Sequence, residues 1–313
     1  MQSFWRGDFA NRNNENLRMT DICCIGHITR DRIITPEQTV SLPGGTAYYF
    51  AKAMNHLPQR INFELVTKVA EEDRKTIEQL KEEGTNVRCF NSRRTVFFEN
   101  KYGKNANNRT QRLLDKADPF TMEEVKDLEA NTFHLGSLLS DDFSTEVIKL
   151  LREKGQVSVD VQGFLRKVDG EQIMPTEWKD MGDILPYINI LKLNEHEMEA
   201  IANDNDPYEV AKTLNHAGVT EVLITLGSYG SVIGVNGQCI NIPAYETERI
   251  VDATGCGDTY STGYLYARAN GASLQEAGQY AAAMCTLKLQ HSGAFDKTEE
   301  DIMEIIRNNN IVD

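Results

Sequence analysis

Short apolar runs alternate with longer amphipathic segments from Asp21 onward. The apolar runs are rich in valine and isoleucine, which is typical of strands buried on both faces of a parallel sheet. Alternation of strand and helix predicts an α/β fold in which helices cover both faces of a central, mostly parallel sheet. The predicted strands are "DICCIGHI" (21–28), "FELVTKVA" (63–70), "TFHLGSL" (132–138), "VSVDV" (157–161), "INILKL" (188–193) and "EVLITLG" (221–227).

Capping signals mark where the intervening helices begin and end. Thr121 with Glu124, and Ser273 with Glu276, have the spacing of capping boxes. The Asn236-Gly237 dipeptide inside 231–244 predicts a β-hairpin, which would form an antiparallel edge of the sheet. Other helices are predicted over 73–83, from Ser144 to Gly155, from about 207 to Gly218, and over 274–289.

Two segments, 29–43 and 91–114, have strand-like alternation without a helix beside them. Turn signals at Gly103 and at Asn107-Asn108 predict a hairpin within the second segment. The two segments could pair into a small β-sheet that projects from the main body as a lid, although two ordinary surface loops also fit the pattern. We therefore expect one domain over 21–313, preceded by a flexible tail over 1–20.

Composition narrows the class of partner and the compartment. Lysine and arginine together number 33 against 47 acidic residues, a net charge of −14, which argues against nucleic acid as a ligand. The six cysteines form no C-x-x-C pair and have no zinc-type spacing, so a reducing, cytoplasmic location is expected. No run approaches the ~18 apolar residues of a membrane span, and no membrane partner is expected.

The stretch "VDATGCGDTYSTG" (251–263) carries the clearest chemical signal. The turn Thr254–Gly257 precedes a predicted helix, so the amides of Gly255, Cys256 and Gly257 would lie at a helix N-terminus that attracts anions. A carboxylate beside a bound phosphoryl group would be repelled unless it takes a proton. Asp258 is therefore a candidate general base for a hydroxyl that attacks phosphorus, although a plain helix-capping role also fits.

Four stretches together resemble the ribokinase-like (PfkB) carbohydrate kinases. "ATGCGD" is similar to that family's anion-hole and catalytic-base motif, and "GHITRDR" with the later "PGG", "KLNEHE" and "TLGSYG" match further motifs in the same order. The resemblance implies a ribokinase-like fold with a lid. It also implies an ATP-dependent phosphotransferase that uses Mg²⁺ and phosphorylates a hydroxyl of a small sugar or polyol. A homodimer formed through the lid strands is a further expectation, because exposed sheet edges invite pairing.

The resemblance also assigns roles to individual residues. Each assignment has a plain alternative: a solvated aspartate, a tight turn, a helix cap or a strand-to-hairpin turn. The substrate-binding residues would be Asp31, Gly44 and Gly45; the nucleotide-binding residues would be Asn194, Thr225, Gly227 and Gly230; Glu197 would hold Mg²⁺ through water, and Asp252 and Thr254, with 292–294, would bind a monovalent cation such as K⁺.

The sequence departs from the family at Tyr49, where an asparagine that contacts the sugar is usual. The acceptor could therefore be an unusual polyol or a modified sugar. Gln162 and Arg166 follow the predicted strand 157–161 at the edge where open sheets bind ligands, so they are candidate substrate contacts. A non-catalytic protein that senses sugar or nucleotide on the same scaffold remains an alternative. A dinucleotide oxidoreductase fits less well, because the G-x-G lacks a third glycine and follows the wrong strand.

Overall fold

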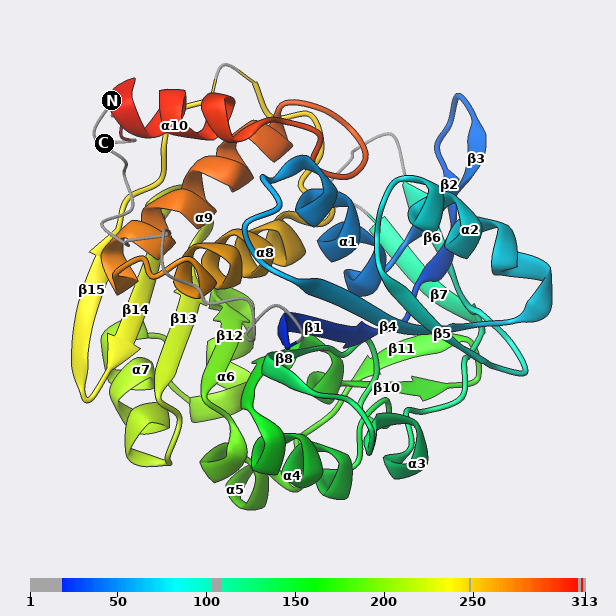
Figure 1. The fold of residues 1–313 in the computed structure, drawn as a ribbon, viewed down its shortest axis with the longest axis horizontal. Helices are drawn as coiled ribbons and strands as arrows, with labels where there is room; N and C mark the ends of the chain where they lie inside the picture. The colour runs from blue at the N-terminus through cyan, green and yellow to red at the C-terminus, as the bar shows by residue number, and fades with distance from the viewer. Residues whose placement is uncertain (1–18, 103–108, 248, 309–310, 312–313) are drawn as a thin grey trace.

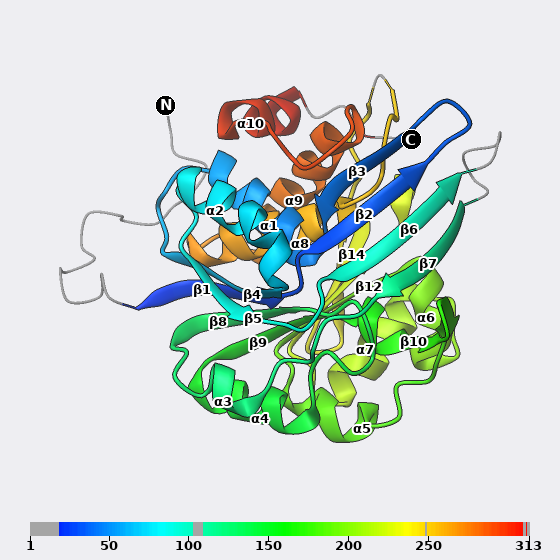
Figure 2. The same ribbon diagram turned by 90° about the vertical axis from the view of Figure 1, so that its right-hand side faces the viewer.

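The computed structural model describes residues 19–102, 109–247, 249–308 and 311. A twisted nine-stranded sheet runs through the molecule, with helices on both faces (Figures 1 and 2). The strand β14 (Ser231–Val235) pairs antiparallel with both of its neighbours, and all other pairs in this sheet are parallel, which confirms the predicted fold class. In spatial order the strands are β15 (Gln238–Ile242), β14 (Ser231–Val235), β13 (Glu221–Thr225), β12 (Ile190–Asn194), β9 (Gln156–Asp160), β8 (Ala130–Gly136), β1 (Thr20–Gly26), β4 (Phe63–Val69) and β5 (Val87–Asn91).

The helices form two layers with separate apolar cores (Figure 2). Both predicted capping boxes are present, at Thr121 and at Ser273. In the part of the chain described, no helix has the length and apolar character needed to cross a membrane. One layer contains α1 (Thr46–His56), α2 (Arg74–Glu82), α8 (Cys256–Ala269), α9 (Leu274–Leu289) and α10 (Glu299–Asn308), and the other contains α3 (Met122–Val125), α4 (Thr145–Lys154), α5 (Met181–Ile184), α6 (Glu195–Ala202) and α7 (Pro207–His216).

The predicted hairpin forms one edge of the main sheet, whereas the strand at the other edge was not predicted. Asn236 and Gly237 both have positive φ, as the tight turn between β14 and β15 requires. The opposite edge strand, β5, was not predicted. Its residues are only half-buried or exposed, so it lacks the apolar run that revealed the central strands.

A second, six-stranded sheet projects beside the first (Figure 2). The two excursions 29–43 and 91–114 meet in it, because β2 (Thr29–Ile34) pairs parallel with β6 (Val96–Tyr102), and the alternative of two surface loops is wrong. The hairpin of β10 and β11 joins the same sheet and was not predicted. Residues 1–18 and the turn signals at Gly103 and Asn107-Asn108 lie outside the described residues. The order is β10 (Arg166–Asp169), β11 (Gln172–Pro175), β7 (Arg109–Asp115), β6 (Val96–Tyr102), β2 (Thr29–Ile34) and β3 (Thr39–Gly44).

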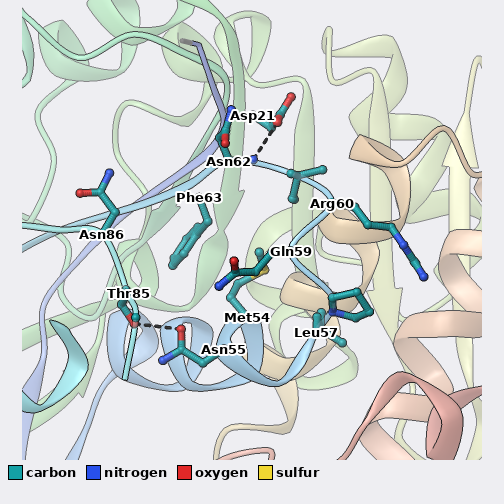
Figure 3. Close-up of a pocket in the computed structure, with 13 residues that line it drawn as sticks. Asp21, Met54, Asn55, Leu57, Gln59, Arg60, Asn62, Phe63, Thr85 and Asn86 are labelled. Carbon is teal, nitrogen blue, oxygen red and sulfur yellow. Dashed lines mark hydrogen bonds between the residues drawn. The ribbon is translucent and has the colours of Figure 1, made fainter. Parts of the chain in front are cut away.

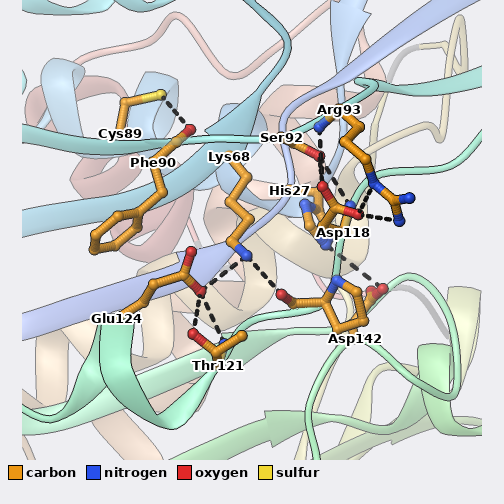
Figure 4. A network of polar contacts seen from close by, with 11 residues as sticks. His27, Lys68, Cys89, Phe90, Ser92, Arg93, Asp118, Thr121, Glu124 and Asp142 are labelled. Atoms are coloured by element: carbon orange, nitrogen blue, oxygen red, sulfur yellow. Dashed lines mark hydrogen bonds and ion pairs between the residues drawn. The ribbon is translucent and has the colours of Figure 1, made fainter.

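A network of polar contacts lies where the chain passes between the main sheet and the lid sheet (Figure 4). The buried Lys68 ammonium on β4 donates to the carbonyl oxygen of Pro119 at 2.5 Å and pairs with the Glu124 carboxylate at 2.8 Å. Nearby, the buried His27 ring lies 3.6 Å from the Asp142 carboxylate, whose other oxygen accepts from two backbone amides. These contacts join segments that lead to β2, to α3 and to α4, so they fix how the lid is attached.

Lys68→Met is expected to destabilise the protein by about 1–3 kcal/mol, because it leaves the Pro119 carbonyl and the Glu124 carboxylate without their buried cation. The cost stays below that of a fully buried pair, since Glu124 also accepts from Thr121. Chemical denaturation measures the loss. The control is Lys126→Met, which removes an exposed lysine from the C-terminal end of α3 and should change the stability by less than about 0.5 kcal/mol. Equal losses in the two variants would contradict the role of Lys68.

Candidate active site

Two cavities meet at the N-terminus of α8, at the edge of the main sheet where the parallel strands end. We call the first the inner cavity: it has a volume of about 310 Å³ and lies between this edge and the lid. The second, the outer cleft, has a volume of about 800 Å³. Asn194, Thr225, Ala253 and Gly257 line both, so a molecule in one would meet a molecule in the other beside Gly257.

The backbone at the start of α8 requires glycine. Gly255 is the N-cap residue with φ +78°, which L-residues rarely adopt. A Cβ atom at Gly255 would lie 2.7 Å from the ring of Tyr49, and one at Gly257 would lie 3.1 Å from the Lys192 ammonium. Of the three predicted amides, that of Cys256 donates to the Ala253 carbonyl at 3.1 Å. The helix therefore begins as predicted, with Tyr49 packed directly beneath its first residue.

Asp258 lies in the first turn of α8 and lines the inner cavity. Its carboxylate is hydrogen-bonded to the Thr46 side chain on α1. Burial in dense surroundings raises the pKa of Asp258 to about 6, and the neighbouring Asp160 carboxylate adds to the rise. Part of the residue's surface still faces the cavity. A carboxyl group with this pKa is suited to accept a proton near neutral pH.

A buried ion pair, which the sequence analysis missed, lies beside Asp258. The Lys192 ammonium on β12 is 2.7 Å from the Asp160 carboxylate at the end of β9, and both line the inner cavity. Although burial favours the neutral acid, the Lys192 ammonium lowers the pKa of Asp160. A lysine inside the apolar run "INILKL" was the available signal, because a charge in a buried strand requires a partner.

Asn194 and Glu197 form a capping box at the start of α6. The Asn194 side chain accepts from the amides of His196 and Glu197, and the Glu197 carboxylate accepts from the Asn194 amide at 2.9 Å. Burial raises the pKa of Glu197, and the Asp160 carboxylate contributes to the rise. The capping alternative thus describes the local structure, while both residues also line the inner cavity.

The predicted substrate residues have different places in the inner cavity. Asp31 lines it, together with Gln162 and Arg166. Gly44 does not line it. A Cβ there would lie 2.5 Å from the Asp31 carboxylate, and a Cβ at Gly45 would lie 2.5 Å from a backbone oxygen. The paired glycines therefore let β3 approach β2 closely, and only Gly45 borders the cavity.

The outer cleft collects the predicted nucleotide-binding residues. Thr225, Gly227 and Gly230 line it, at the turn after β13. Packing also requires a glycine at position 230, because a Cβ there would lie 2.1 Å from the carbonyl oxygen of Ile242. An apolar part of the wall comes from the loop before α8 and from α9: Tyr245, Ile250, Ala282 and Leu289.

Thr254 lines the inner cavity, whereas Asp252 lines neither this cavity nor the outer cleft. The amide of Thr254 donates to the Asp252 carboxylate at 2.9 Å. The Lys288 ammonium on α9 lies 3.7 Å from the same carboxylate. The segment proposed for a monovalent cation therefore already faces a buried lysine, which the sequence analysis did not identify.

A third hollow, of about 330 Å³, lies at the opposite edge of the sheet, where β1 and β4 begin (Figure 3). Several of its polar side chains are already paired within the protein. The Asp21 carboxylate accepts from the Asn62 amide, Thr85 donates to Asn55, and Arg60 pairs with Glu299. This hollow shares no lining residue with the inner cavity or the outer cleft, so it takes no part in the candidate site.

Comparison with known proteins gives consistent matches. The model of the pfkB family carbohydrate kinases matches residues 19–301. A nucleoside kinase from Methanocaldococcus jannaschii is 24% identical over 302 residues, covering 88% of this chain and 92% of the relative. A solved pyrophosphate-dependent kinase of the ribokinase family, in complex with a pyrophosphate analog and myo-inositol, superposes with a TM-score of 0.77 at 25% identity. That match covers 91% of this chain and all of the solved chain (100%). Ribokinase from Arabidopsis thaliana, solved with ribose and ATP, has a TM-score of 0.75 at 20% identity, covering 92% of this chain and 99% of that one.

Proposed function

Because this chain belongs to the PfkB family of carbohydrate kinases, we propose that it transfers the terminal phosphoryl group of ATP to a hydroxyl of a small sugar or polyol. The junction of the two cavities beside Gly257 carries the proposal. The nucleotide occupies the outer cleft, the acceptor occupies the inner cavity, and the phosphoryl group crosses where the two meet. Asp258 is the general base.

The reaction is a direct displacement at phosphorus. Asp258 takes the proton of the acceptor hydroxyl, the hydroxyl oxygen forms a bond to phosphorus, and the bond to the bridging oxygen of ATP breaks to release ADP. The amides of Gly255 and Gly257 stabilise the charge on the phosphoryl oxygens, because they lie at the positive end of α8. The Cys256 amide, which is used within the turn, contributes less. The buried Lys192 ammonium, next to Gly257, adds a fixed positive charge.

The residues at the junction suit Mg²⁺, which prefers one or two carboxylates together with water and substrate phosphates. Among the described residues, no group of three or more His, Cys, Asp or Glu side chains could hold a metal ion alone. Glu197 would hold the ion through water, and Asn194 would reach a phosphate. When bound, the ion neutralises phosphate charge. Burial and the Asp160 carboxylate raise the pKa of Glu197, and a nearby cation would offset both effects.

ATP is favoured over pyrophosphate as the donor because the outer cleft extends far beyond the junction. Its apolar wall, which includes Tyr245, Ile250 and Leu289, provides a surface for a nucleobase that pyrophosphate would not use. The solved relative at 25% identity is a pyrophosphate-dependent kinase. Pyrophosphate is therefore the second donor that must be tested.

The acceptor is proposed to be a polyol or a modified sugar in preference to ribose or a nucleoside. Tyr49 replaces the asparagine usual in the family, and its ring forms part of the inner cavity wall beside Asp31 and Gly255. The cavity is the smaller of the two and is polar, with Asp31, Gln162 and Arg166 available to bind hydroxyls. The myo-inositol complex of the solved relative supports the same class of acceptor.

ADP release, coupled to a colour reaction, tests the proposal over a panel of sugars, polyols and nucleosides. Turnover with ATP, Mg²⁺ and at least one sugar or polyol is expected, with less from nucleosides. A parallel series with pyrophosphate, followed by phosphate release, identifies the donor. Binding of ATP without turnover of any acceptor would contradict the proposal and favour a sensing protein on the same scaffold.

A homodimer through the lid remains a proposal of its own. The strand β3 is an edge of the lid sheet, and Leu42 on it is half exposed. Unpaired strand edges with apolar side chains favour pairing with a second copy. Sedimentation or light scattering over a range of concentrations would reveal whether the chain dimerises.

The pH profile is expected to report Asp258. Since the base must be ionised to accept a proton, kcat/KM should fall about tenfold per pH unit below the pKa of about 6 and level off above it. Circular dichroism at each pH is the control that separates protonation from unfolding. A rate that stays constant down to pH 5, roughly one unit below that pKa, would contradict the assignment of Asp258 as the base.

A further inference from the structure

Lys288 is a fully buried lysine in the last turn of α9. None of its side-chain surface is exposed (0%). Its ammonium donates to the carbonyl oxygen of Asp252 at 3.0 Å and to that of His291 at 3.4 Å. It also lies 3.7 Å from the Asp252 carboxylate. A lysine ammonium has three hydrogens to donate and no acceptor, so these oxygens are the groups that compensate its buried charge.

The same oxygens occupy the region that the family resemblance assigns to a monovalent cation. That assignment used Asp252 and Thr254 on one side and 292–294 on the other, and Lys288 bonds to the first segment and to the adjoining His291. An ammonium group has the charge of a potassium ion and a similar size. A second cation beside it would be repelled by roughly 4 kcal/mol at about 4 Å separation near a protein surface. The residues present therefore do not fit a bound potassium ion.

We propose that the Lys288 ammonium permanently takes the place of the monovalent cation, so that this protein works without potassium or sodium. Lys288 is a positioning residue in this role. By binding the Asp252 carbonyl it holds the segment 252–254, in which Thr254 also donates to Asp252. That segment leads directly into Gly255 and thus sets where the amides at the start of α8 lie.

Further contacts between the end of α9 and the start of α8 support this account. The Cys285 thiol, one turn before Lys288 on α9, lies 3.2 Å from the Cys256 carbonyl oxygen on α8. The amides of Val251 and Asp252 in turn donate to the Leu289 carbonyl at 2.7 and 3.4 Å. The end of α9 is thus hydrogen-bonded to the segment that leads into α8, and Lys288 contributes a positive charge to that contact.

Two measurements of the response to potassium test the proposal. Turnover, which rests on the proposed function, is followed at constant ionic strength while tetramethylammonium is replaced by potassium. The thermal unfolding midpoint is followed in the same buffers and does not depend on the acceptor, so a failure of the proposed function would leave this second measurement intact. For the natural protein, neither quantity should respond to potassium beyond the ionic-strength control.

Lys288→Ala removes the ammonium and leaves space for an ion. Without potassium, kcat is expected to fall at least about fivefold, the lower end of typical coupling between sites. Potassium or ammonium should restore part of that loss and raise the unfolding midpoint, because an ion that binds only the folded state stabilises it. Lys288→Met fills the space without charge, so it should lose activity and show no rescue.

Lys212→Met is the matched control, because Lys212 lies exposed on α7 and pairs with Glu209, three residues before it. It should behave as the natural protein does in every buffer. Activation of the natural protein by potassium of more than about fivefold would overturn the proposal, as would a Lys288→Ala variant that is fully active without potassium. Should Lys288→Ala fail to fold, the potassium response of the natural protein alone decides the outcome.

Discussion

Asp258→Asn is expected to lower kcat about 10²–10⁴-fold, the usual contribution of a positioned general base. Asparagine keeps the size and the contact with Thr46 but cannot accept the hydroxyl proton. The affinity for ATP should remain close to that of the natural protein, because the outer cleft does not include Asp258. Coupled ADP release gives kcat, and calorimetric titration with a non-hydrolysable ATP analogue gives the affinity.

The same substitution should make the protein more stable at pH 7. Because the pKa of Asp258 rises from 3.8 unfolded to about 6 folded, the folded state holds this proton more tightly. The resulting stabilisation is present below pH 3.8 and is lost as the pH rises through about 6. At pH 7 the buried carboxylate therefore costs up to about 3 kcal/mol, which Asp258→Asn removes.

The exposed Asp127, just after α3, supplies the control for both measurements. Asp127→Asn changes the net charge by the same amount as Asp258→Asn, at a residue that lines neither the inner cavity nor the outer cleft. It should alter neither kcat nor stability appreciably. An Asp258→Asn variant that keeps more than about a tenth of the natural kcat would rule out Asp258 as the base. A variant that loses stability at pH 7 would contradict the account of its pKa.

Local signals in the sequence were sufficient for most of the fold. Capping pairs such as Ser273 with Glu276 fix helix starts through contacts three residues apart, so they can be recognised without knowing the tertiary structure. The central strands are equally visible, because burial on both faces makes them continuously apolar. The edge strand β5 and the lid hairpin β10–β11 escaped prediction, since strands with one exposed face carry weaker patterns.

The chemistry of the site depended more on contacts between distant residues. The glycines and Asp258 at the start of α8 could be identified from one short stretch, because a helix N-terminus is a local feature. The pairs Asp160 with Lys192 and Asp252 with Lys288 could not, since each joins residues more than thirty positions apart. A charged residue in an apolar run signals that a partner exists but does not identify it.

Gly255→Ala is the second substitution expected to have a large effect, with a loss in kcat of about 10²–10³-fold if the amide position is displaced. The methyl group would enter the ring of Tyr49, whose nearest atom would lie 2.7 Å away. Either the ring or the start of α8 must move. Since the helix start carries the amides that face the junction of the two cavities, the phosphoryl group would lose its stabilising donors.

Gly271→Ala separates this collision from simple backbone strain. Gly271 has a φ of +84°, close to the +78° of Gly255, but nothing lies within 4 Å of its Cβ position. Both variants should lose about 1–2 kcal/mol of stability from the left-handed backbone, while only Gly255→Ala should lose turnover. Adding Tyr49→Ala to Gly255→Ala should recover part of kcat, because it removes the atoms that the methyl group meets. Equal turnover in the two alanine variants would mean that the amides at the start of α8 do not act on the phosphoryl group.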